Sequence, residues 1–475
     1  MRHAPDGLPL LGHALKFVEP RHVLFDWFVR CQRRHGLETV QISIPTLASG
    51  VIISDPVNLE FVLKNEHLIS KGDFVKKRSR DLFGNGIINA SGDLWKAQRK
   101  AGLKFFSGNN LDVMVEEVLP QAWAKVRSHL LMYAQEQSTF DMQACCLDYS
   151  SFIVASMAYE IDLDASHPFS KAFDYASDQI GRRFQNPLYP VTELLFGANF
   201  RTALAVVQKF GRNIVAKAKQ DRAQKAFESL IDDHEPAFNT LLDSLMESLV
   251  DPSLVADAAL NFLSAGKDTT AQSMTWTIYA IMRNPQVLEP IRTELRTRFG
   301  HHAREEGVIK LSAADLQPSN LPFLMATYYE ALRLFPPVPF EIQECQQDVT
   351  LPDHTFLPKD SIVIWCIWAM NRSKELYGYD ADIFKPERWL DGDGSFHPRS
   401  AFEFPVFNGG PRACLGKKMA ELMAMYLLAH VFLNFDVSES SSPSDSSAQR
   451  TAQNSLTLPM AGGLPCHIRP QAQAE

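Results

Sequence analysis

The sequence lacks several features that would place a chain of this length in a simple class. No window of about 20 residues is continuously apolar, so no segment is expected to span a bilayer. No signal peptide is visible at the N-terminus. The formal net charge is only −8 over 475 residues, a mild acidity that disfavours nucleic acid as a partner.

Cysteine is also sparse, and its spacing is irregular. The seven cysteines form neither metal-spacing pairs nor an even-numbered disulfide framework. They are Cys31, Cys145, Cys146, Cys345, Cys366, Cys414 and Cys466. We therefore expect free thiols in a reducing compartment.

Residues 406–416, Val-Phe-Asn-Gly-Gly-Pro-Arg-Ala-Cys-Leu-Gly, are the most informative stretch. Glycine suits the positive φ angles of a sharp bend, and proline fixes a turn. Cys414 ends this loop just before an apolar run of helical period over residues 417–435. Backbone N–H groups and the helix dipole would stabilise a thiolate there. The alternative is a buried, inert core thiol.

The pattern Phe407-x-x-Gly410-x-Arg412-x-Cys414-x-Gly416 resembles the haem-binding signature of the cytochrome P450 family. The resemblance implies non-covalent haem b with Cys414 as the thiolate ligand of the iron. It also implies that the other four residues of the pattern bind the cofactor, Arg412 through a haem propionate. Family-like motifs follow in family order over residues 5–465, so the implied fold is the mainly α P450 fold with small β-sheets.

Trp95 and Arg99 lie four residues apart, on one face of an expected helix. Their spacing resembles the family's propionate-binding helix, which implies that both residues hold the cofactor. A surface or cation–π pair is the alternative. Nearby lysines predict a basic face suited to an acidic reductase, against the alternative of an ordinary solvated surface. These lysines are Lys96, Lys100, Lys104, Lys417 and Lys418.

The longest helix signal opens at Asp251-Pro252 and runs to residue 284, where Pro285 ends it. In its middle is Ala265-Gly-Lys-Asp-Thr-Thr, an unfavourable composition for a helix interior. We expect the glycine to leave room for dioxygen and substrate. The segment resembles the family's oxygen-activation motif, which implies that Asp268 and Thr269 are catalytic and handle protons. An exposed Asp-Thr kink without a partner is the alternative.

Glu330 and Arg333 form an acid–base pair three residues apart, which alone means little. Together with Pro386-Glu-Arg388-Trp it resembles a structural ion network of the family, implying that Glu330, Arg333 and Arg388 lock together beneath the haem loop. One position departs from the family pattern. Gln343 stands where many relatives carry a base that pairs with a second propionate, so a neutral hydrogen bond or a contact from another residue would replace that ion pair.

The resemblance assigns a substrate pocket to residues from several segments. Residues 184–200 resemble the segment that covers the family's substrate channel, and residues 458–464 resemble a turn that enters its active site. Residues 73–89 show no clear period and are expected to form a long functional loop. The predicted pocket residues are Phe184, Leu263, Ala265, Val338, Phe340 and Met460.

Local patterns predict further elements. Residues 40–44 and 50–53 are expected to form a hairpin, and Asp55-Pro56 to start a helix that ends near residue 64. Residues 1–15 resemble the proline-rich hinge that follows a membrane anchor in eukaryotic relatives, with the anchor itself missing. Residues 16–475 would then form one catalytic domain, in which residues 438–450 are a flexible Ser-rich loop.

The resemblance implies a monooxygenase that receives electrons from a separate NADPH-cytochrome P450 reductase, with cytochrome b5 as a further candidate partner. It places the protein at the cytosolic face of the endoplasmic reticulum, in peripheral contact with the membrane. The haem loop looks like that of fungal alkane and fatty-acid ω-hydroxylases, which favours terminal hydroxylation of a long acyl chain. Hydroxylation of a bulkier terpenoid-like metabolite, or gas sensing without turnover, are the alternatives. Where animal fatty-acid hydroxylases attach haem through a Glu, this chain has Ala265.

Overall fold

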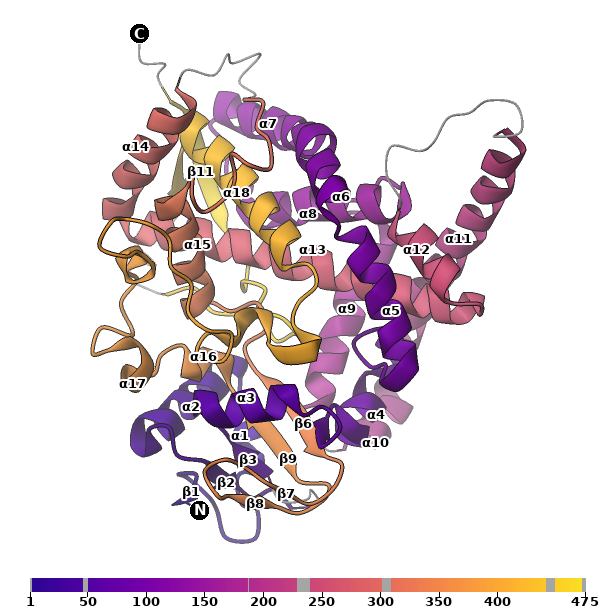
Figure 1. The fold of residues 1–475 in the computed structure, drawn as a ribbon, viewed down its shortest axis with the longest axis vertical. Helices are drawn as coiled ribbons and strands as arrows, with labels where there is room; N and C mark the ends of the chain where they lie inside the picture. The colour runs from indigo at the N-terminus through magenta and orange to yellow at the C-terminus, as the bar shows by residue number, and fades with distance from the viewer. Residues whose placement is uncertain are drawn as a thin grey trace.

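The computed structural model describes residues 2–45, 50–186, 188–228, 240–300, 309–440 and 449–471. Helices dominate these ranges, and the predicted mainly α architecture with small sheets is confirmed (Figure 1). The first eight α-helices are α1 Ala14–Val18, α2 Arg21–His35, α3 Pro56–Lys64, α4 Gly72–Phe83, α5 Gly92–Phe105, α6 Gly108–Val113, α7 Leu119–Glu136 and α8 Met142–Tyr159. The others are α9 Pro168–Arg183, α10 Tyr189–Phe196, α11 Ala198–Glu228, α12 Leu241–Ser248, α13 Pro252–Arg283, α14 Leu288–Phe299, α15 Pro322–Leu334, α16 Ile367–Met370, α17 Lys374–Tyr377 and α18 Lys417–Asn434.

The largest sheet has six strands in the order β1-β2-β3-β9-β6-β4 and lies at the N-terminal end of the molecule (Figure 1). Its strands are β1 Arg2–His3, β2 Val40–Ile42, β3 Gly50–Ile52, β4 Ile69–Ser70, β6 Glu341–Cys345 and β9 Ile362–Trp365. Antiparallel pairing of β2 with β3 confirms the predicted hairpin. The strands β5 Phe140–Asp141, β10 Phe435–Glu439 and β11 Pro465–Pro470 form a second sheet, and β7 Val349–Thr350 pairs with β8 Phe356–Leu357.

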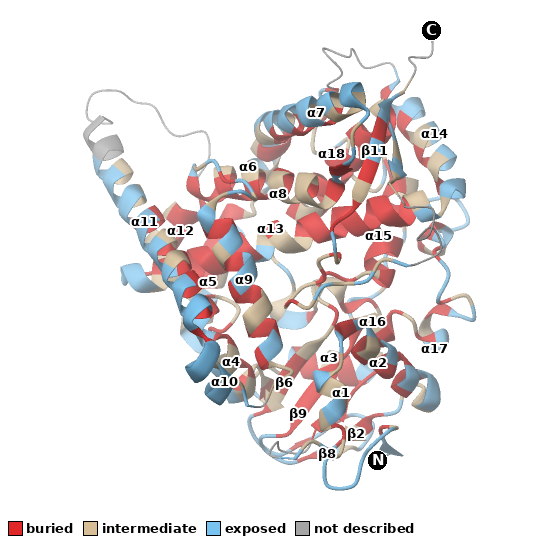
Figure 2. Ribbon diagram, turned by 180° about the vertical axis from the view of Figure 1, so that it is seen from behind, coloured by how far each residue is buried: buried red, intermediate tan, exposed pale blue. Residues whose placement is uncertain are grey.

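Helix α13 crosses the middle of the molecule (Figure 1), and its bounds agree with those predicted from the sequence. The Asp251 side chain accepts a hydrogen bond of 2.8 Å from the Ser253 N–H, and Pro252 occupies the first turn. Most of its residues are buried beneath α8, α11, α15 and α18 (Figure 2). Helix α13 is therefore the rigid element on which other parts of the core are assembled. The predicted start of α3 is confirmed in the same way, with Asp55 capping the Val57 N–H.

The prediction of a loop over residues 73–89 is wrong for most of that segment, because α4 covers Gly72–Phe83. Helix α4 buries Val75, Leu82 and Phe83, three of the few apolar side chains in its sequence. Six mostly charged residues separate Val75 from Leu82, and they hid the helical period.

Two predicted boundaries also need correction. Ser438 and Glu439 belong to β10, where they pair with His467 and Cys466, so the Ser-rich loop does not begin at residue 438. Residues 441–448 of that predicted loop lie outside the described residues. The proposed limit between residues 15 and 16 falls inside α1, and the segment before it is packed through β1 against β2.

All seven cysteines are free, as expected from their spacing. No helix in the described ranges combines the length and apolar character that a bilayer crossing requires.

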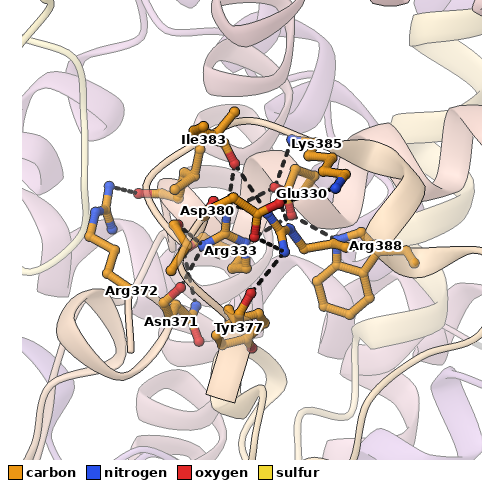
Figure 3. A network of polar contacts seen from close by, with 12 residues as sticks. Glu330, Arg333, Asn371, Arg372, Tyr377, Asp380, Ile383, Lys385 and Arg388 are labelled. Atoms are coloured by element: carbon orange, nitrogen blue, oxygen red, sulfur yellow. Dashed lines mark hydrogen bonds and ion pairs between the residues drawn. The ribbon is translucent and has the colours of Figure 1, made fainter. Parts of the chain in front are cut away.

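Glu330 on α15 is the centre of a buried ion network (Figure 3). Its carboxylate accepts two hydrogen bonds of 2.8 Å from Arg333 and one of 2.9 Å from the Nε of Arg388. Trp389 Nε1 donates to the same carboxylate at 2.9 Å, and the Lys385 N–H donates at 2.8 Å. Although burial acts in the opposite direction, these donors hold the pKa of Glu330 below its ordinary value.

The network holds the segment that leads into the Cys414 loop. Trp389 packs at 4.8 Å between ring centroids against Phe404, and Phe404 stacks on Tyr329 of α15 at 5.5 Å. Tyr329 in turn lies 6.2 Å from Phe407 in the loop. The contacts predicted among Glu330, Arg333 and Arg388 are thus present, and they connect α15 to the loop through aromatic rings.

We expect Glu330→Gln to lower the free energy of unfolding in urea by about 3–5 kcal/mol, because it leaves two buried guanidinium groups without their counter-charge. Glu60→Gln on α3 is the matched control, since Glu60 pairs with Lys64 at the surface. Its loss should cost less than about 1 kcal/mol. Equal losses in the two variants would contradict this role for Glu330.

Candidate active site

The loop before α18 has a geometry that requires its glycine. Gly410 has a φ of +63°, and a Cβ there would come within 2.4 Å of the Leu63 carbonyl oxygen. The loop closes where the Cys414 N–H donates to the Phe407 carbonyl at 2.8 Å. Cys414 therefore sits at the end of a tight loop, three residues before the first residue of α18.

The Cys414 side chain retains accessible surface although it is surrounded by protein groups. Burial raises the pKa of its thiol, while the N–H groups of Gly416 and Lys417 and the charge of Arg99 act in the opposite direction. Coordination to iron would deprotonate such a thiol outright. Within the described ranges, no group of three or more His, Cys, Asp or Glu side chains could hold a metal ion. Cys414 offers a single thiolate donor, which fits a porphyrin iron because that iron needs one protein ligand.

The basic residues predicted to bind propionates are gathered beside this loop. Arg412 and Arg99 both lie over the ring of Trp95, at 4.6 and 5.5 Å from its centroid. Arg99 donates to the Ala413 carbonyl at 3.1 Å, which ties α5 to the loop. Arg412 donates to the Ala90 carbonyl at 2.8 Å. The structure thus brings these three side chains into one cationic cluster.

Glu66 was not identified from the sequence, and it forms an ion pair with Arg412. The Arg412 Nε donates to the Glu66 carboxylate at 2.7 Å, and Nη2 contacts the same oxygen. Glu66 lies just beyond the end of α3, 346 positions from Arg412 in the chain. No local pattern could have indicated this contact.

The middle of α13 presents Ala265 and Thr269 on an accessible face. Thr269 Oγ1 donates to the Ala265 carbonyl at 2.6 Å, a back-bond that competes with the regular helix ladder. The expectation for Gly266 was wrong. A Cβ on Gly266 would meet Val154 of α8 at 3.0 Å, so this glycine allows α8 to pack closely and does not open space for a ligand.

Asp268 lies in a buried cluster with a lysine that the sequence analysis did not assign. Lys267 is 0% exposed, and its Nζ donates to Asp174 of α9 at 3.0 Å and also to Asp268. Burial and the charge of Asp174 together raise the pKa of Asp268 to about 6, although Lys267 acts in the opposite direction. Although burial acts in the opposite direction, the two carboxylates raise the pKa of Lys267. Asp268 can therefore exchange a proton near neutral pH.

The predicted pocket residues do not all share one surface. Phe184 at the end of α9 pairs with Phe74 of α4, 6.2 Å between ring centroids, and Val338 is half-buried. Leu263 is wholly buried. It lies three residues from Gly266, on the side of α13 that packs against α8, and not on the accessible face with Ala265.

Met460 is buried, and its backbone is held by α8. Its backbone N–H and carbonyl are both bound by the side chain of Gln143 on α8. Thr457, earlier in the same segment, accepts a hydrogen bond of 2.8 Å from Gln272 of α13. The C-terminal turn therefore approaches the middle of α13 through Thr457.

Gln343 lies on β6 and is 6% exposed. Its Oε1 has no hydrogen-bond partner among the residues that the structure describes. A buried, unpaired amide oxygen is unfavourable, and the amide can still donate through Nε2. The side chain is thus suited to a neutral hydrogen bond with a polar cofactor group, although it cannot form an ion pair.

We expect two substitutions beside Asp268 to shift its pKa in opposite directions. Lys267→Gln removes the cation that stabilises the carboxylate, so the pKa should rise above its value of about 6. Asp174→Asn removes a like charge, so the pKa should fall. Infrared titration of the protonated carboxyl measures both shifts, with Asp268→Asn assigning the signal. Shifts in the same direction would refute this electrostatic account.

Comparison with known proteins identifies the family. The sequence model described as "Cytochrome P450" matches residues 3–463. Cytochrome P450 CYP94D108 of Paris polyphylla is 28% identical over 492 residues, covering 100% of this chain and 94% of that protein. Cytochrome P450 monooxygenase cyp1 of Mycosarcoma maydis is 30% identical over 449 residues, covering 91% of this chain and 69% of that protein. Cytochrome P450 86B1 of Arabidopsis thaliana is 31% identical over 401 residues, covering 80% and 71% respectively.

The match runs over nearly the whole chain, and it includes both the loop that carries Cys414 and the turn of α13 that carries Asp268. The chain belongs to the cytochrome P450 family of haem-thiolate monooxygenases, in which a cysteine binds the haem iron.

Proposed function

We propose that this P450 hydroxylates a long-chain fatty acid or alkane at or near its terminal carbon, with electrons from a separate NADPH-cytochrome P450 reductase. Bound haem supplies the iron at which dioxygen is activated. Cys414 is the proposed ligand of that iron. Trp95, Arg99 and Arg412 hold the propionates, and the backbone of the Gly410 loop keeps Cys414 in place.

The middle of α13 is the observation that carries the hydroxylase assignment. Thr269 is bonded to the Ala265 carbonyl, on the same face as the small side chain of Ala265. Asp268, with its pKa of about 6, can hold and release a proton near neutral pH. These two side chains would handle the protons that monooxygenation consumes.

The proposed substrate class is supported by apolar side chains on the segments assigned to the pocket and by the resemblance of the haem loop to fungal ω-hydroxylases. Phe74 and Phe184 pair between α4 and α9, while Val338 and Phe340 are half-buried on the chain between α15 and β6. Apolar walls suit a long alkyl chain, because its binding is driven mainly by the removal of apolar surface from water. Ala265 leaves space for its end.

A reductase would dock beside the Cys414 loop. A Cβ on Gly102 of α5 would lie 2.9 Å from Leu415, so α5 packs directly on the loop. Lys96 and Lys417 expose 69% and 46% of their side chains. Lys104 pairs with Glu247 at 2.7 Å and Lys96 pairs with Asp93 at 3.1 Å, so the basic face is smaller than the sequence predicted. The remaining lysines suit an acidic partner.

Peripheral contact with the endoplasmic reticulum membrane is supported by the surface around α10. Helix α10 is coloured largely as exposed in Figure 2, and large apolar side chains in and beside it are exposed to solvent. They are Leu188, Val191, Leu194, Leu195 and Phe196. An exposed apolar patch of this kind suits insertion into the interfacial layer of a bilayer.

The test is a mass-spectrometric product screen with saturated fatty acids from lauric to stearic acid, n-alkanes and a reconstituted reductase. We expect terminal or near-terminal hydroxy products that require NADPH. Cys414→Ser should abolish both these products and the red-shifted Soret band of the reduced, carbon-monoxide-treated enzyme. A spin-state shift with a polycyclic terpenoid, and none with lauric acid, would favour the bulkier substrate class and contradict the proposal.

Haem should be held without a covalent bond to α13, because the Ala265 side chain has no carboxyl group that could esterify it. Extraction with acid acetone should leave colourless protein. The Ala265→Glu variant gives the comparison, since it introduces the group that an ester bond requires. Haem retained by the unsubstituted protein after extraction would contradict this expectation.

A further inference from the structure

Arg21, the first residue of α2, is a buried cation at the meeting point of three segments. It is 4% exposed. Its Nε donates to the Asn454 side chain at 2.8 Å, and its guanidinium lies 5.3 Å from the centre of the Phe340 ring. A Cβ on Gly181 of α9 would lie 3.2 Å from its Nη2. The guanidinium therefore lies between α9, the C-terminal turn and Phe340.

Within the described part of the chain, the guanidinium of Arg21 has no counter-ion. Among the residues that the structure describes, no carboxylate lies within ion-pair distance of it, and the buried Nη1 has no hydrogen-bond partner. Burial lowers the pKa of Arg21 to about 10, opposed only by the charge of Asp178. Asp178 itself accepts from the Nε of Arg182 at 3.0 Å. A buried cation without an ion-pair partner is strongly unfavourable.

A second buried arginine on α9 shows how this chain otherwise satisfies such a group. Arg183 is also 4% exposed, and its guanidinium binds two carboxylates. It contacts Asp81 at 2.7 Å and Glu193 at 2.6 Å. Arg21 resembles Arg183 in burial but lacks these carboxylates, so its site is complete only when an anion is supplied from outside.

The segments around Arg21 are those that carry the proposed substrate region. Phe340 follows Val338 by two residues. Gly181 lies on α9, three residues before Phe184. Asn454 belongs to the turn in which Thr457 reaches Gln272 of α13. The C-terminal segment therefore contacts both Arg21, through Asn454, and α13, through Thr457.

We infer that Arg21 is a specificity residue that binds the carboxylate of a fatty-acid substrate. The inference rests on the proposed function and deepens it, because it selects fatty acids over alkanes. The carboxylate accepts hydrogen bonds from the guanidinium, including the unpaired Nη1, and provides the missing counter-charge. With that end held at α2, the distal end of the chain extends toward α13, which directs hydroxylation to the terminal carbons.

The experiment compares lauric acid with its methyl ester by spin-state titration of the holoenzyme. The ester keeps the alkyl chain and removes the charge. Arg21→Met retains most of the side-chain volume and should weaken lauric acid binding by about 10- to 100-fold, with methyl laurate unchanged. Arg21→Lys should restore part of the loss. Arg30→Met is the matched control, because Arg30 is an exposed arginine on the same helix, α2, and should leave both affinities unchanged.

Asp178→Asn provides a second variant with the opposite expected result. Removal of the nearby negative charge should tighten lauric acid binding and leave methyl laurate unchanged. In Arg21→Met, retained ester binding also shows that the variant is folded. Equal weakening of acid and ester, or no change in either, would overturn the role of Arg21.

The wild-type enzyme separates this inference from the proposed function. Equal affinity for lauric acid and its ester would leave the proposed hydroxylase intact and refute recognition of the carboxylate. Binding of neither compound would refute the proposed function and the inference together. Preference for the acid, lost in Arg21→Met, would support both.

Discussion

The position of Cys414 depends on a buried carboxylate that takes no part in chemistry. Glu330 accepts hydrogen bonds from two arginines, a tryptophan and a backbone N–H, so α15 is bound firmly to the segment around Trp389. Aromatic packing through Phe404 then connects that segment to the loop. A buried ion network of this kind contributes little net stability compared with apolar packing, yet it strongly disfavours other arrangements because each broken contact leaves a charge unpaired.

Much of the site could be predicted because its residues lie in short motifs. The Cys414 loop, the Trp95–Arg99 spacing and the start of α13 each depend on neighbours within one turn or one loop, and the structure has them where the sequence placed them. The family resemblance added the expectation that Glu330 and Arg388 meet. These residues are 58 positions apart, a separation over which spacing alone predicts nothing.

The errors and omissions have a common physical origin in long-range packing. Helix α4 was missed because its buried residues are few and become visible only against the elements that cover them. Leu263 was assigned to the pocket by its apolar character, which cannot distinguish the accessible side of α13 from the sides packed against other helices. Arg21, Glu66 and Lys267 have partners contributed by distant segments, so none of them has a local signature.

Lys267 links two helices in a way that has a thermodynamic consequence. Asp174 belongs to α9, whereas Lys267 and Asp268 belong to α13. A displacement of α9 that separates Asp174 from Lys267 leaves the ammonium with one carboxylate, and that carboxylate then holds its proton less tightly. The position of α9 and the pKa of Asp268 are therefore thermodynamically coupled. A ligand that shifts the helix changes the acid strength, and protonation of the acid must in return change the free energy of shifting the helix.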